Sequence, residues 1–513
     1  MDFKTQLYNH QVKCVEKLKR IKIGALYMEQ GTGKTRTALE LIKIRLEKER
    51  INHVLWLCPC SVKENLRRDI ILHTGDEQKD LITICGIESL SSSNRINKEL
   101  SELVKSKSCY LIIDESSLVK NFFAKRTKNI MELSNNCTYK LILNGTPISR
   151  NEIDLFSQWY LLDHRVLGYQ SYWSFAANHI EYDENIPGKV RKCLNVDYLA
   201  EKIAPYAYQV KKDECLDLPP KTYDTEYFSL THEQNIHYEE VKDIFLSDVD
   251  EFDETTIYRL FNALQLVLSG FRINAEYVEK KVLVYNPANP GFREEKIVRK
   301  IETIEKTEFF ENAEDNPRLQ TLLDIVYRID TKVIIFCKYT HEINLVIKSL
   351  NKIYGDNSAV AFNGDLNLKK RQANLDKFKD ESRFLVANKQ CGAFGLNLQW
   401  CSYIIYYSND WDYGTRIQSE DRIHRIGQNK NVNIIDICAS NKLDERILDC
   451  LFKKERLVDS FKKEIDDKKD VLDAFESWIT VKTKDRWSRG KYKYKYRQKK
   501  VQDLDKSDLI IKE

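Results

Sequence analysis

The sequence predicts an α/β fold in which two parallel β-sheets are each covered by helices on both faces. Short apolar segments rich in β-branched residues alternate with longer helical patterns, which is typical of parallel sheets. These segments form two series that are separated by about 190 residues, a distance too long for a loop. A chain of 513 residues has room for two to four domains. We therefore expect two α/β domains with a different segment inserted between them.

Each predicted strand is a short, continuous apolar run, as expected for a strand buried on both faces. The first series comprises Val54–Cys58, Tyr110–Ile113 and Lys140–Leu143, and the second comprises Val333–Cys337, Phe384–Ala387, Tyr403–Tyr407 and Val432–Ile437. The intervening stretch has aromatic-rich helical patterns at Tyr169–Ile180 and Phe261–Phe271. It also has an alternating segment, Tyr277–Ile304, whose central prolines and glycine predict a β-hairpin.

These patterns predict four regions along the chain. The expected boundaries are 1–165 for the first lobe, 166–310 for a helical and hairpin insertion, 311–455 for the second lobe, and 456–513 for a helical extension with a basic tail.

The overall composition indicates an ordinary soluble protein and says little about its partners. The 82 Lys and Arg residues nearly balance the 78 Asp and Glu residues, for a net charge of +4. No apolar run is long enough for a transmembrane helix, and the first residues lack the features of a secretory signal. Thirteen cysteines occur without a Cys-x-x-Cys pair. We expect reduced thiols in a cytoplasmic protein, with Cys58 and Cys60 at a buried strand end in preference to a metal site.

The tail is distinguished by its charge. Between Val481 and Lys500, ten basic residues stand against one acidic residue, so the remainder of the chain is net negative. Aromatic residues are interleaved with the cations, and Lys491, Tyr492 and Lys493 are candidate contacts to nucleic acid. The alternating Lys-Tyr pattern is also compatible with an edge strand, and a disordered, solvated tail is a further alternative.

A glycine-rich turn, Gly31-Thr32-Gly33-Lys34-Thr35, precedes a helix-forming run from Arg36 to Arg50. Such a turn leaves backbone N–H groups directed at phosphate oxygens, and the helix dipole favours the negative charge. Lys34 is suited to the β- and γ-phosphates, and the Thr35 hydroxyl to Mg²⁺. Met28 occupies the position of the first glycine of the full phosphate-loop pattern, so a chance glycine-rich helix start is the alternative.

Two adjacent carboxylates, Asp114 and Glu115, end the apolar run Leu111–Ile113 about 80 residues further on. The carboxyl edge of a parallel sheet is where open α/β folds bind ligands. We expect Asp114 to hold Mg²⁺ and Glu115 to orient or deprotonate the attacking water. An ordinary acidic turn is the alternative, which the glycine-rich turn upstream disfavours.

These motifs, with Gln11, resemble the nucleotide motifs of superfamily 2 helicases. Leu143–Ile148 is similar to the Leu-Thr-Gly-Thr-Pro motif of Swi/Snf-type ATPases, and Gly392–Leu398 is similar to their fifth motif. Gln418–Gln428 resembles the sixth, including the closing Arg-Ile-Gly-Gln. Further similarities are Asp410-Trp411 and the connector from Ala204 to Thr222, so the resemblance covers about residues 3 to 450.

The resemblance implies two RecA-like lobes of the P-loop NTPase class, with ATP and Mg²⁺ as cofactors. It implies a contact of Gln11 with the adenine edge. The nucleotide contacts that it implies are Gln11, Gly31, Thr32, Gly33, Lys34, Thr35, Asp114, Gly395, Asn397 and Gln418. Arg422 and Arg425 are three residues apart on a predicted helix and would supply positive charge to the transferred phosphate, which can contribute ~10³–10⁵ in rate.

The resemblance also implies a nucleic-acid surface built from small residues and free amides, which contact phosphates without base specificity. Its candidate residues are Pro59, Ser61, Gly86, Thr146, Lys338 and Gly392. Two departures from the family pattern concern the acidic motif and the third motif. Ser116-Ser117 follow the acidic pair where the family has Ala-His or Gly-His, and Asn144 replaces a threonine.

We therefore expect a monomeric, ATP-dependent translocase on double-stranded or branched DNA, acting in a bacterial or phage-infected cell. Branch migration, fork remodelling and displacement of bound protein are all compatible with this expectation. A strand-separating DNA or RNA helicase is one alternative, since the hairpin over Tyr277–Ile304 has the form of a wedge. A nucleic-acid-binding scaffold with a decayed ATPase is another, although the intact motif residues disfavour it.

Overall fold

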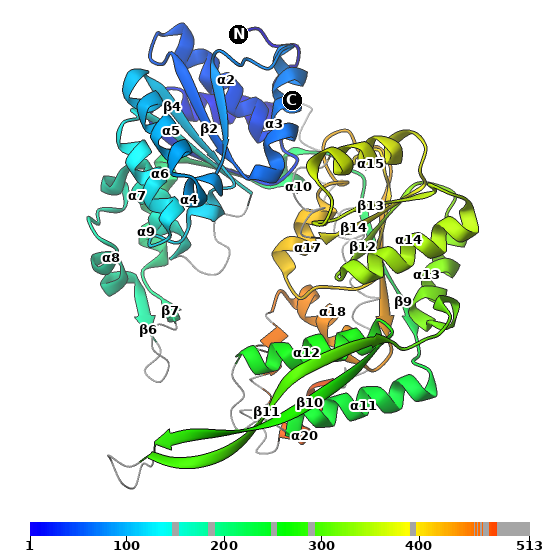
Figure 1. Ribbon diagram of the computed structural model, residues 1–513. Helices are drawn as coiled ribbons and strands as arrows, with labels where there is room; N and C mark the ends of the chain where they lie inside the picture. Colours follow the sequence, from blue (N-terminus) through cyan, green and yellow to red (C-terminus); the bar gives the residue numbers. More distant parts are fainter. Residues whose placement is uncertain are drawn as a thin grey trace, which may run out of the picture. The chain divides into compact units, whose positions relative to one another are not determined.

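The computed structural model describes residues 1–145, 153–182, 190–247, 254–285, 293–389, 397–455, 457–458, 460–461, 464 and 471–479. The chain forms two compact units. The first comprises Met1–Pro219, Ala393–Trp400 and Gln418–Asn429, and the second comprises Pro220–Gly392, Cys401–Ile417 and Lys430–Glu513. Each unit is built on its own six-stranded sheet, and all neighbouring strands in both sheets are parallel (Figure 1).

The first sheet has the strand order β3-β2-β4-β5-β1-β8. Its strands are β1 (Ile23–Met28), β2 (His53–Cys58), β3 (Ile82–Gly86), β4 (Cys109–Asp114), β5 (Tyr139–Asn144) and β8 (Ala207–Val210). Alternate residues of β2 enter two different cores, with Leu55 in one and Trp56 in the other. Both faces of the sheet are therefore covered, as the continuous apolar runs predict.

Helices supply these two coverings (Figure 1). Those whose apolar residues join the core of Trp56 are α1 (Asn9–Leu18), α2 (Lys34–Glu47) and α3 (Lys63–Thr74). Those that join the core of Leu55 are α5 (Asn94–Ser106), α6 (Lys125–Asn135), α7 (Asp154–Leu167), α8 (Tyr172–His179) and α9 (Val196–Ile203). The remaining elements of this unit are α4 (Ser89–Ser92), α10 (Lys212–Cys215), the 3-10 turns Cys60–Val62, Ser116–Val119 and Ala204–Tyr206, and the hairpin of β6 (Ile180–Tyr182) and β7 (Val190–Cys193).

The second sheet has the order β13-β14-β12-β15-β16-β9. Its strands are β9 (Lys221–Phe228), β12 (Val333–Cys337), β13 (Ala359–Phe362), β14 (Phe384–Asn388), β15 (Tyr403–Tyr406) and β16 (Val432–Ala439). Its helices are α13 (Pro317–Tyr327), α14 (Thr340–Tyr354), α15 (Leu368–Asp380), α18 (Leu443–Lys453) and α20 (Val471–Ile479), with the 3-10 turn Ala313–Asp315. Helix α17 (Tyr413–Glu420) begins in this unit and ends in the first.

The predicted hairpin is present and is longer than the sequence indicated. Strands β10 (Phe271–Tyr285) and β11 (Arg293–Glu308) pair antiparallel and form the long arm that extends from α11 (His232–Ser247) and α12 (Glu254–Leu268) in Figure 1. The helical pattern predicted to run to Phe271 ends at Leu268, because Gly270 adopts a positive φ of 94° and β10 begins after it. Helix α12 packs in the core of the second sheet, with the ring of Phe261 stacked on Trp478 at 5.2 Å.

The stretch assigned to an insertion, 166–310, also contributes an edge strand to each sheet. Strand β8 pairs with β1 in the first unit, and β9 pairs with β16 in the second. Strand β9 lies at the edge of the sheet and is only partly buried, so its sequence is polar. It therefore has no apolar run from which a strand could be predicted. The four predicted regions remain predictions, and the change from one unit to the other falls between Pro219 and Pro220.

Two expectations from the composition, on the cysteines and on membrane-spanning helices, can be compared with the described residues. The described cysteines are free thiols, with Cys58 buried at the end of β2 and Cys60 exposed just after it. Within the described ranges, no helix is both long and apolar enough to span a membrane. The basic tail, including Lys491, Tyr492 and Lys493, lies outside the described residues.

Candidate active site

The glycine-rich turn joins the carboxyl end of β1 to the start of α2. Gly31 and Gly33 adopt positive φ values of 82° and 87°, which glycine accepts without a side-chain penalty. Gly33 is the residue before the helix, so α2 begins at Lys34 with free N–H groups in its first turn. The Thr32 hydroxyl donates to the Glu29 carbonyl at 2.7 Å and holds the turn closed. This geometry provides an anion-binding helix start.

Lys34 lies along the mouth of this turn. Its ammonium donates to the Met28 carbonyl at 2.8 Å and to the Glu29 carbonyl at 3.3 Å. Burial lowers the pKa of Lys34, although the carboxylates of Asp114 and Glu115 act in the opposite direction. An anion next to this ammonium would relieve the cost of burying its charge.

Asp114 is the last residue of β4 and Glu115 follows it, and β4 is separated from β1 in the sheet only by β5. Burial raises the pKa of Asp114 to about 6, while the ammonium of Lys34 opposes that shift. The Asp114 carboxylate accepts the Glu115 N–H at 3.0 Å, and Glu115 itself has a left-handed backbone with φ 56°. The Ser117 hydroxyl donates to Glu115 Oε1 at 2.9 Å. Both carboxylates are thus oriented by short-range hydrogen bonds at the edge where Lys34 lies.

The two departures from the family pattern meet in the structure. The buried Ser116 hydroxyl donates to Gln158 Oε1 at 2.5 Å and accepts a hydrogen bond from Asn144 Nδ2 at 3.3 Å. Ser116 follows the acidic pair, Asn144 ends β5, and Gln158 is on α7. The acidic motif is therefore connected to the neighbouring strand by serine and asparagine. Gln158 was not anticipated from the sequence, because no motif includes it.

The residues around Arg422 and Arg425 belong to the first compact unit. The prediction that both arginines share a helix is wrong, because α17 ends at Glu420 and the following residues form turns. Arg422 Nη2 donates to Gln30 Oε1 at 2.7 Å, so its guanidinium reaches the residue before Gly31. Burial, with a smaller contribution from Arg425, lowers the pKa of Arg422 to about 10.

Arg425 packs directly against the glycine-rich turn. A Cβ at Gly31 would lie 2.6 Å from the Cβ of Arg425, so only glycine permits this approach. The Arg425 guanidinium donates to Asn397 Oδ1, and Asn397 Nδ2 donates to Asp69 Oδ1 of α3 at 3.3 Å. Burial lowers the pKa of Arg425, and the carboxylate of Asp69 opposes that shift. The predicted residues Arg425 and Asn397 are thus neighbours, whereas Asp69 carried no sequence signal.

Gln11 lies on α1 and contacts the same turn. Its Nε2 donates to the Thr32 carbonyl at 3.1 Å, and its Oε1 accepts the Tyr8 N–H at 3.0 Å. The side chain is almost completely buried. Its predicted contact with adenine stays a prediction. The neighbouring His10 also bonds to the Thr32 carbonyl, at 2.8 Å.

Other predicted nucleotide contacts are only partly described. Thr35 is half-buried in the first turn of α2, and Gln418 is half-buried on α17. Gly395 lies outside the described residues. Glu29, Gln30 and Lys212 were missed: the first two immediately precede the turn and could have been inferred from that position, whereas Lys212 had no such signal.

Three candidate nucleic-acid contacts of the first unit lie together at the carboxyl ends of β2 and β3. Pro59 follows β2, Ser61 is exposed in the next turn, and Gly86 ends β3. A Cβ at Gly86 would lie 2.1 Å from Cys60 Sγ, so the two strand ends are closely packed. The Cys60 N–H donates to a carboxylate oxygen of Glu88 at 2.9 Å. Thr146 and Gly392 lie outside the described residues.

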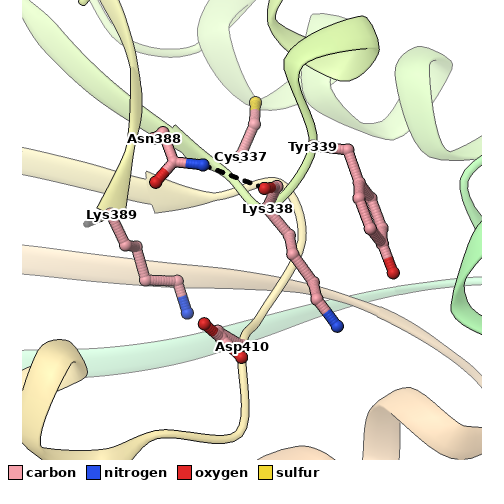
Figure 2. Close-up of a pocket in the computed structure, with 6 residues that line it drawn as sticks. All are labelled: Cys337, Lys338, Tyr339, Asn388, Lys389 and Asp410. Carbon is pink, nitrogen blue, oxygen red and sulfur yellow. Dashed lines mark hydrogen bonds between the residues drawn. The ribbon is translucent and has the colours of Figure 1, made fainter. Parts of the chain in front are cut away.

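Lys338, the candidate contact of the second unit, lines a pocket of about 150 Å³ at the carboxyl ends of β12, β14 and β15 (Figure 2). Its ammonium donates to Gln265 Oε1 at 2.5 Å and lies 3.4 Å from the ring centre of Trp411. Figure 2 also shows Lys389 and Asp410 in this pocket. Burial lowers the pKa of Lys338 to about 8 and that of Lys389 to about 7. The role of Lys338 as a phosphate contact stays a prediction.

Comparison with protein families gives two matches along the chain. The SNF2-related domain matches residues 10–272, which is about half of the chain, and the helicase conserved C-terminal domain matches residues 317–427.

Several curated proteins are similar to this chain. An uncharacterized ATP-dependent helicase from Mycoplasma genitalium is 25% identical over 375 residues, covering 72% of this chain and 32% of that protein. One from Mycoplasma pneumoniae is 25% identical over 477 residues, covering 88% of this chain and 42% of that protein. TATA-binding protein-associated factor 172 from Homo sapiens is 25% identical over 376 residues, covering 66% and 20%. The chain thus spans less than half the length of these relatives.

Among solved structures, the Sulfolobus solfataricus SWI2/SNF2 ATPase core in complex with dsDNA is 21% identical, with a TM-score of 0.37. The alignment covers 94% of this chain and 96% of that chain.

Proposed function

The chain belongs to the SNF2-related family and carries an ATP-dependent helicase/translocase core, and we propose that it hydrolyses ATP to move along double-stranded or forked DNA. The observation that supports this proposal best is the position of Arg422 and Arg425 at the glycine-rich turn. Arg422 bonds to Gln30, and Arg425 fills the space that a side chain at Gly31 would occupy. A basic group at this position is what transfer of a terminal phosphate requires.

The residues present are suited to a magnesium nucleotide. Gly31 and Gly33 adopt the positive φ values that place the free N–H groups of α2 at this turn, and the Lys34 ammonium lies beside them. Asp114 and the Thr35 hydroxyl offer two oxygen ligands. Magnesium usually keeps waters and substrate phosphates as its other ligands, so a larger cluster of carboxylates is not required. When bound, the metal would neutralise charge on the β- and γ-phosphates.

Each protein group then has a defined task in hydrolysis. Lys34 and the N–H groups of α2 would hold the phosphates, and Glu115 would orient the attacking water and accept its proton. The hydrogen bond from Ser117 fixes one oxygen of the Glu115 carboxylate, which limits its rotation. Arg422 and Arg425 would stabilise the charge that develops on the transferred phosphate.

We propose that the protein moves along duplex DNA and contacts the DNA through its phosphates. The small residues Ser61 and Gly86, at the ends of neighbouring strands, suit close approach to a sugar–phosphate backbone. Branch migration, fork remodelling and removal of bound protein are all outcomes of such movement. A strand-separating helicase is the second candidate, favoured by the long hairpin of β10 and β11.

The test is ATP turnover measured in parallel with no polymer, duplex DNA, single-stranded DNA, forked DNA and RNA. We expect the largest stimulation by duplex or forked DNA. Stimulation by RNA alone would refute the duplex translocase. Turnover with duplex DNA combined with release of a labelled strand would favour the strand-separating helicase.

A matched variant distinguishes an active ATPase from a binding scaffold. Glu115→Gln should bind ATP with nearly wild-type affinity and lose hydrolysis, because the amide cannot accept a proton from water. If the wild type and Glu115→Gln bind DNA equally and neither turns over ATP on any polymer, a nucleic-acid-binding scaffold is the correct description.

A further inference from the structure

Lys212 is a buried residue that no nucleotide motif contains. It begins the short helix α10, between the last strand of the first sheet, β8, and the residues Pro219 and Pro220 at which the chain enters the second unit. Its side chain is only 7% exposed. Its backbone N–H donates to Glu29 Oε2 at 2.8 Å, which attaches α10 to the residue two positions before Gly31.

The ammonium of Lys212 bonds to two groups in the segment that carries the arginines. It donates to Asp421 Oδ1 at 2.7 Å and to the His424 carbonyl at 2.8 Å. The Asp421 side chain is 11% exposed, so both members of this ion pair are largely removed from water. Hydrogen bonds to buried charged groups are stronger and more demanding in geometry than those on the surface.

These two bonds bracket Arg422. Asp421 precedes it and His424 follows it by two positions, and the His424 ring bonds to the Pro219 carbonyl at 2.8 Å. Arg422 lies between these fixed points and reaches Gln30. This segment forms turns with local backbone hydrogen bonds, such as that from His424 N–H to the Glu420 carbonyl at 3.1 Å, and lacks the continuous ladder of a helix. The side chain of Lys212 supplies part of the missing constraint.

These contacts form a closed circuit that joins the glycine-rich turn to the segment with the arginines. Glu29 is bonded to Lys212, Lys212 to Asp421, and the next residue in the chain, Arg422, is bonded to Gln30, the neighbour of Glu29. One side of the circuit is the nucleotide loop and the other side is the arginine segment. Displacing Lys212 would release the segment without removing any group that touches the phosphates.

We propose that Lys212 is a positioning residue that holds the segment carrying Arg422 and Arg425 on the glycine-rich turn. This inference rests on the proposed ATPase function. Its consequence is specific to the transition state. Loss of Lys212 should slow the chemical step and leave nucleotide binding nearly unchanged, since Lys34 and the start of α2 remain in place.

The first experiment compares Lys212→Met with Lys211→Met, its exposed neighbour, in DNA-stimulated ATP hydrolysis. We expect Lys212→Met to lower kcat about tenfold or more, less than the ~10³–10⁵ that an arginine itself can contribute, and to change KM for ATP by less than about threefold. Lys211→Met should behave as the wild type. Lys212→Arg keeps the charge and should recover part of kcat. If the ion pair only stabilised the fold, Lys212→Met would lower the thermal midpoint and leave kcat of the folded protein unchanged.

The second experiment does not depend on turnover. Amide hydrogen exchange of residues 418–429 should be faster in Lys212→Met than in the wild type, while exchange in β2 and β4 stays the same. If Lys212→Met unfolds, the same comparison is made with Lys212→Gln, which removes the charge and keeps a polar side chain. Wild-type kcat together with unchanged exchange in 418–429 would overturn the inference. An inactive wild type with faster exchange in the variant would instead refute the proposed function and retain the positioning role.

Discussion

Asn144 and Ser116 are hydrogen-bonded to each other, with Asn144 Nδ2 donating to Ser116 Oγ at 3.3 Å. Both residues are fully buried. Each lies in a motif that departs from the family pattern, one in the third motif and one beside the acidic pair. The departures are therefore spatially coupled, and they connect the acidic motif to the end of β5 by a hydrogen bond that alanine or glycine at position 116 could not accept.

Ser116→Ala should destabilise the first unit, because Asn144 and Gln158 each lose one hydrogen bond in a buried site. We expect about 1–3 kcal/mol in the free energy of unfolding. Combining it with Asn144→Ala should give a coupling of about 0.5–1.5 kcal/mol in a double-mutant cycle measured by chemical denaturation. Ser106→Ala on the exposed end of α5 is the matched control. Additive effects of Ser116→Ala and Asn144→Ala would contradict the coupling.

Arg425→Ala should abolish measurable hydrolysis, with a loss of ~10³ or more in kcat, because the charge that develops on the phosphate is no longer compensated. ATP affinity, measured by nucleotide titration, should change much less. Arg95→Ala removes a surface arginine of α5 and should leave both quantities at wild-type values. Wild-type turnover by Arg425→Ala would remove this residue from the active site.

Gly31→Ala should impair hydrolysis because of contact with Arg425. The new Cβ would lie 2.6 Å from the Cβ of Arg425, and φ of 82° is unfavourable for alanine. Gly355→Ala is the control for backbone strain alone, since Gly355 has φ of 96° with nothing within 4 Å of its Cβ position. We expect a loss of about tenfold or more in kcat for Gly31→Ala and no loss for Gly355→Ala. Wild-type kcat in Gly31→Ala would contradict the inference that the close approach of Arg425 to the turn matters.

Lys389 should make the stability of the second unit depend on pH. Burial lowers its pKa to about 7 in the folded protein, below the value of 10.5 of an unperturbed lysine. Between these values the unfolded chain binds a proton that the folded chain does not, so this residue makes stability rise with pH. Lys389→Met should therefore have a thermal-midpoint advantage over the wild type that is largest at pH 7 and shrinks towards pH 10.

Thermal midpoints of the wild type, Lys389→Met and Lys369→Met, taken from pH 7 to pH 10, check this expectation. Lys369 is exposed on α15, so its variant should follow the wild-type pH profile. A difference between Lys389→Met and the wild type that stays constant from pH 7 to pH 10 would show that Lys389 remains charged in the folded protein throughout this range.

Local sequence patterns predicted much of the fold. Strands such as Val333–Cys337 were predicted with their observed bounds, because a strand buried on both faces needs a continuous apolar run. The strands β1, β3, β8, β9 and β13 were not predicted; β9 is partly exposed and β8 and β13 are short, whereas β1 is a buried apolar run that was missed. The helix predicted through Arg422 and Arg425 ends at Glu420, and the residues after it form turns with local backbone hydrogen bonds, such as that from Ile423 N–H to the Glu420 carbonyl.

The sequence by itself determined the two α/β units, the turn Gly31–Thr35, the acidic pair and the motif that carries the arginines. Each of these features consists of residues that are adjacent in the chain, so the local sequence pattern is enough to indicate it. Only the tertiary structure decided that Arg422 bonds to Gln30, 392 positions away, and that Lys212 bonds to Asp421, 209 positions away. Such pairs depend on how whole elements pack, and a single charged residue such as Lys212 has no local pattern that indicates its partner.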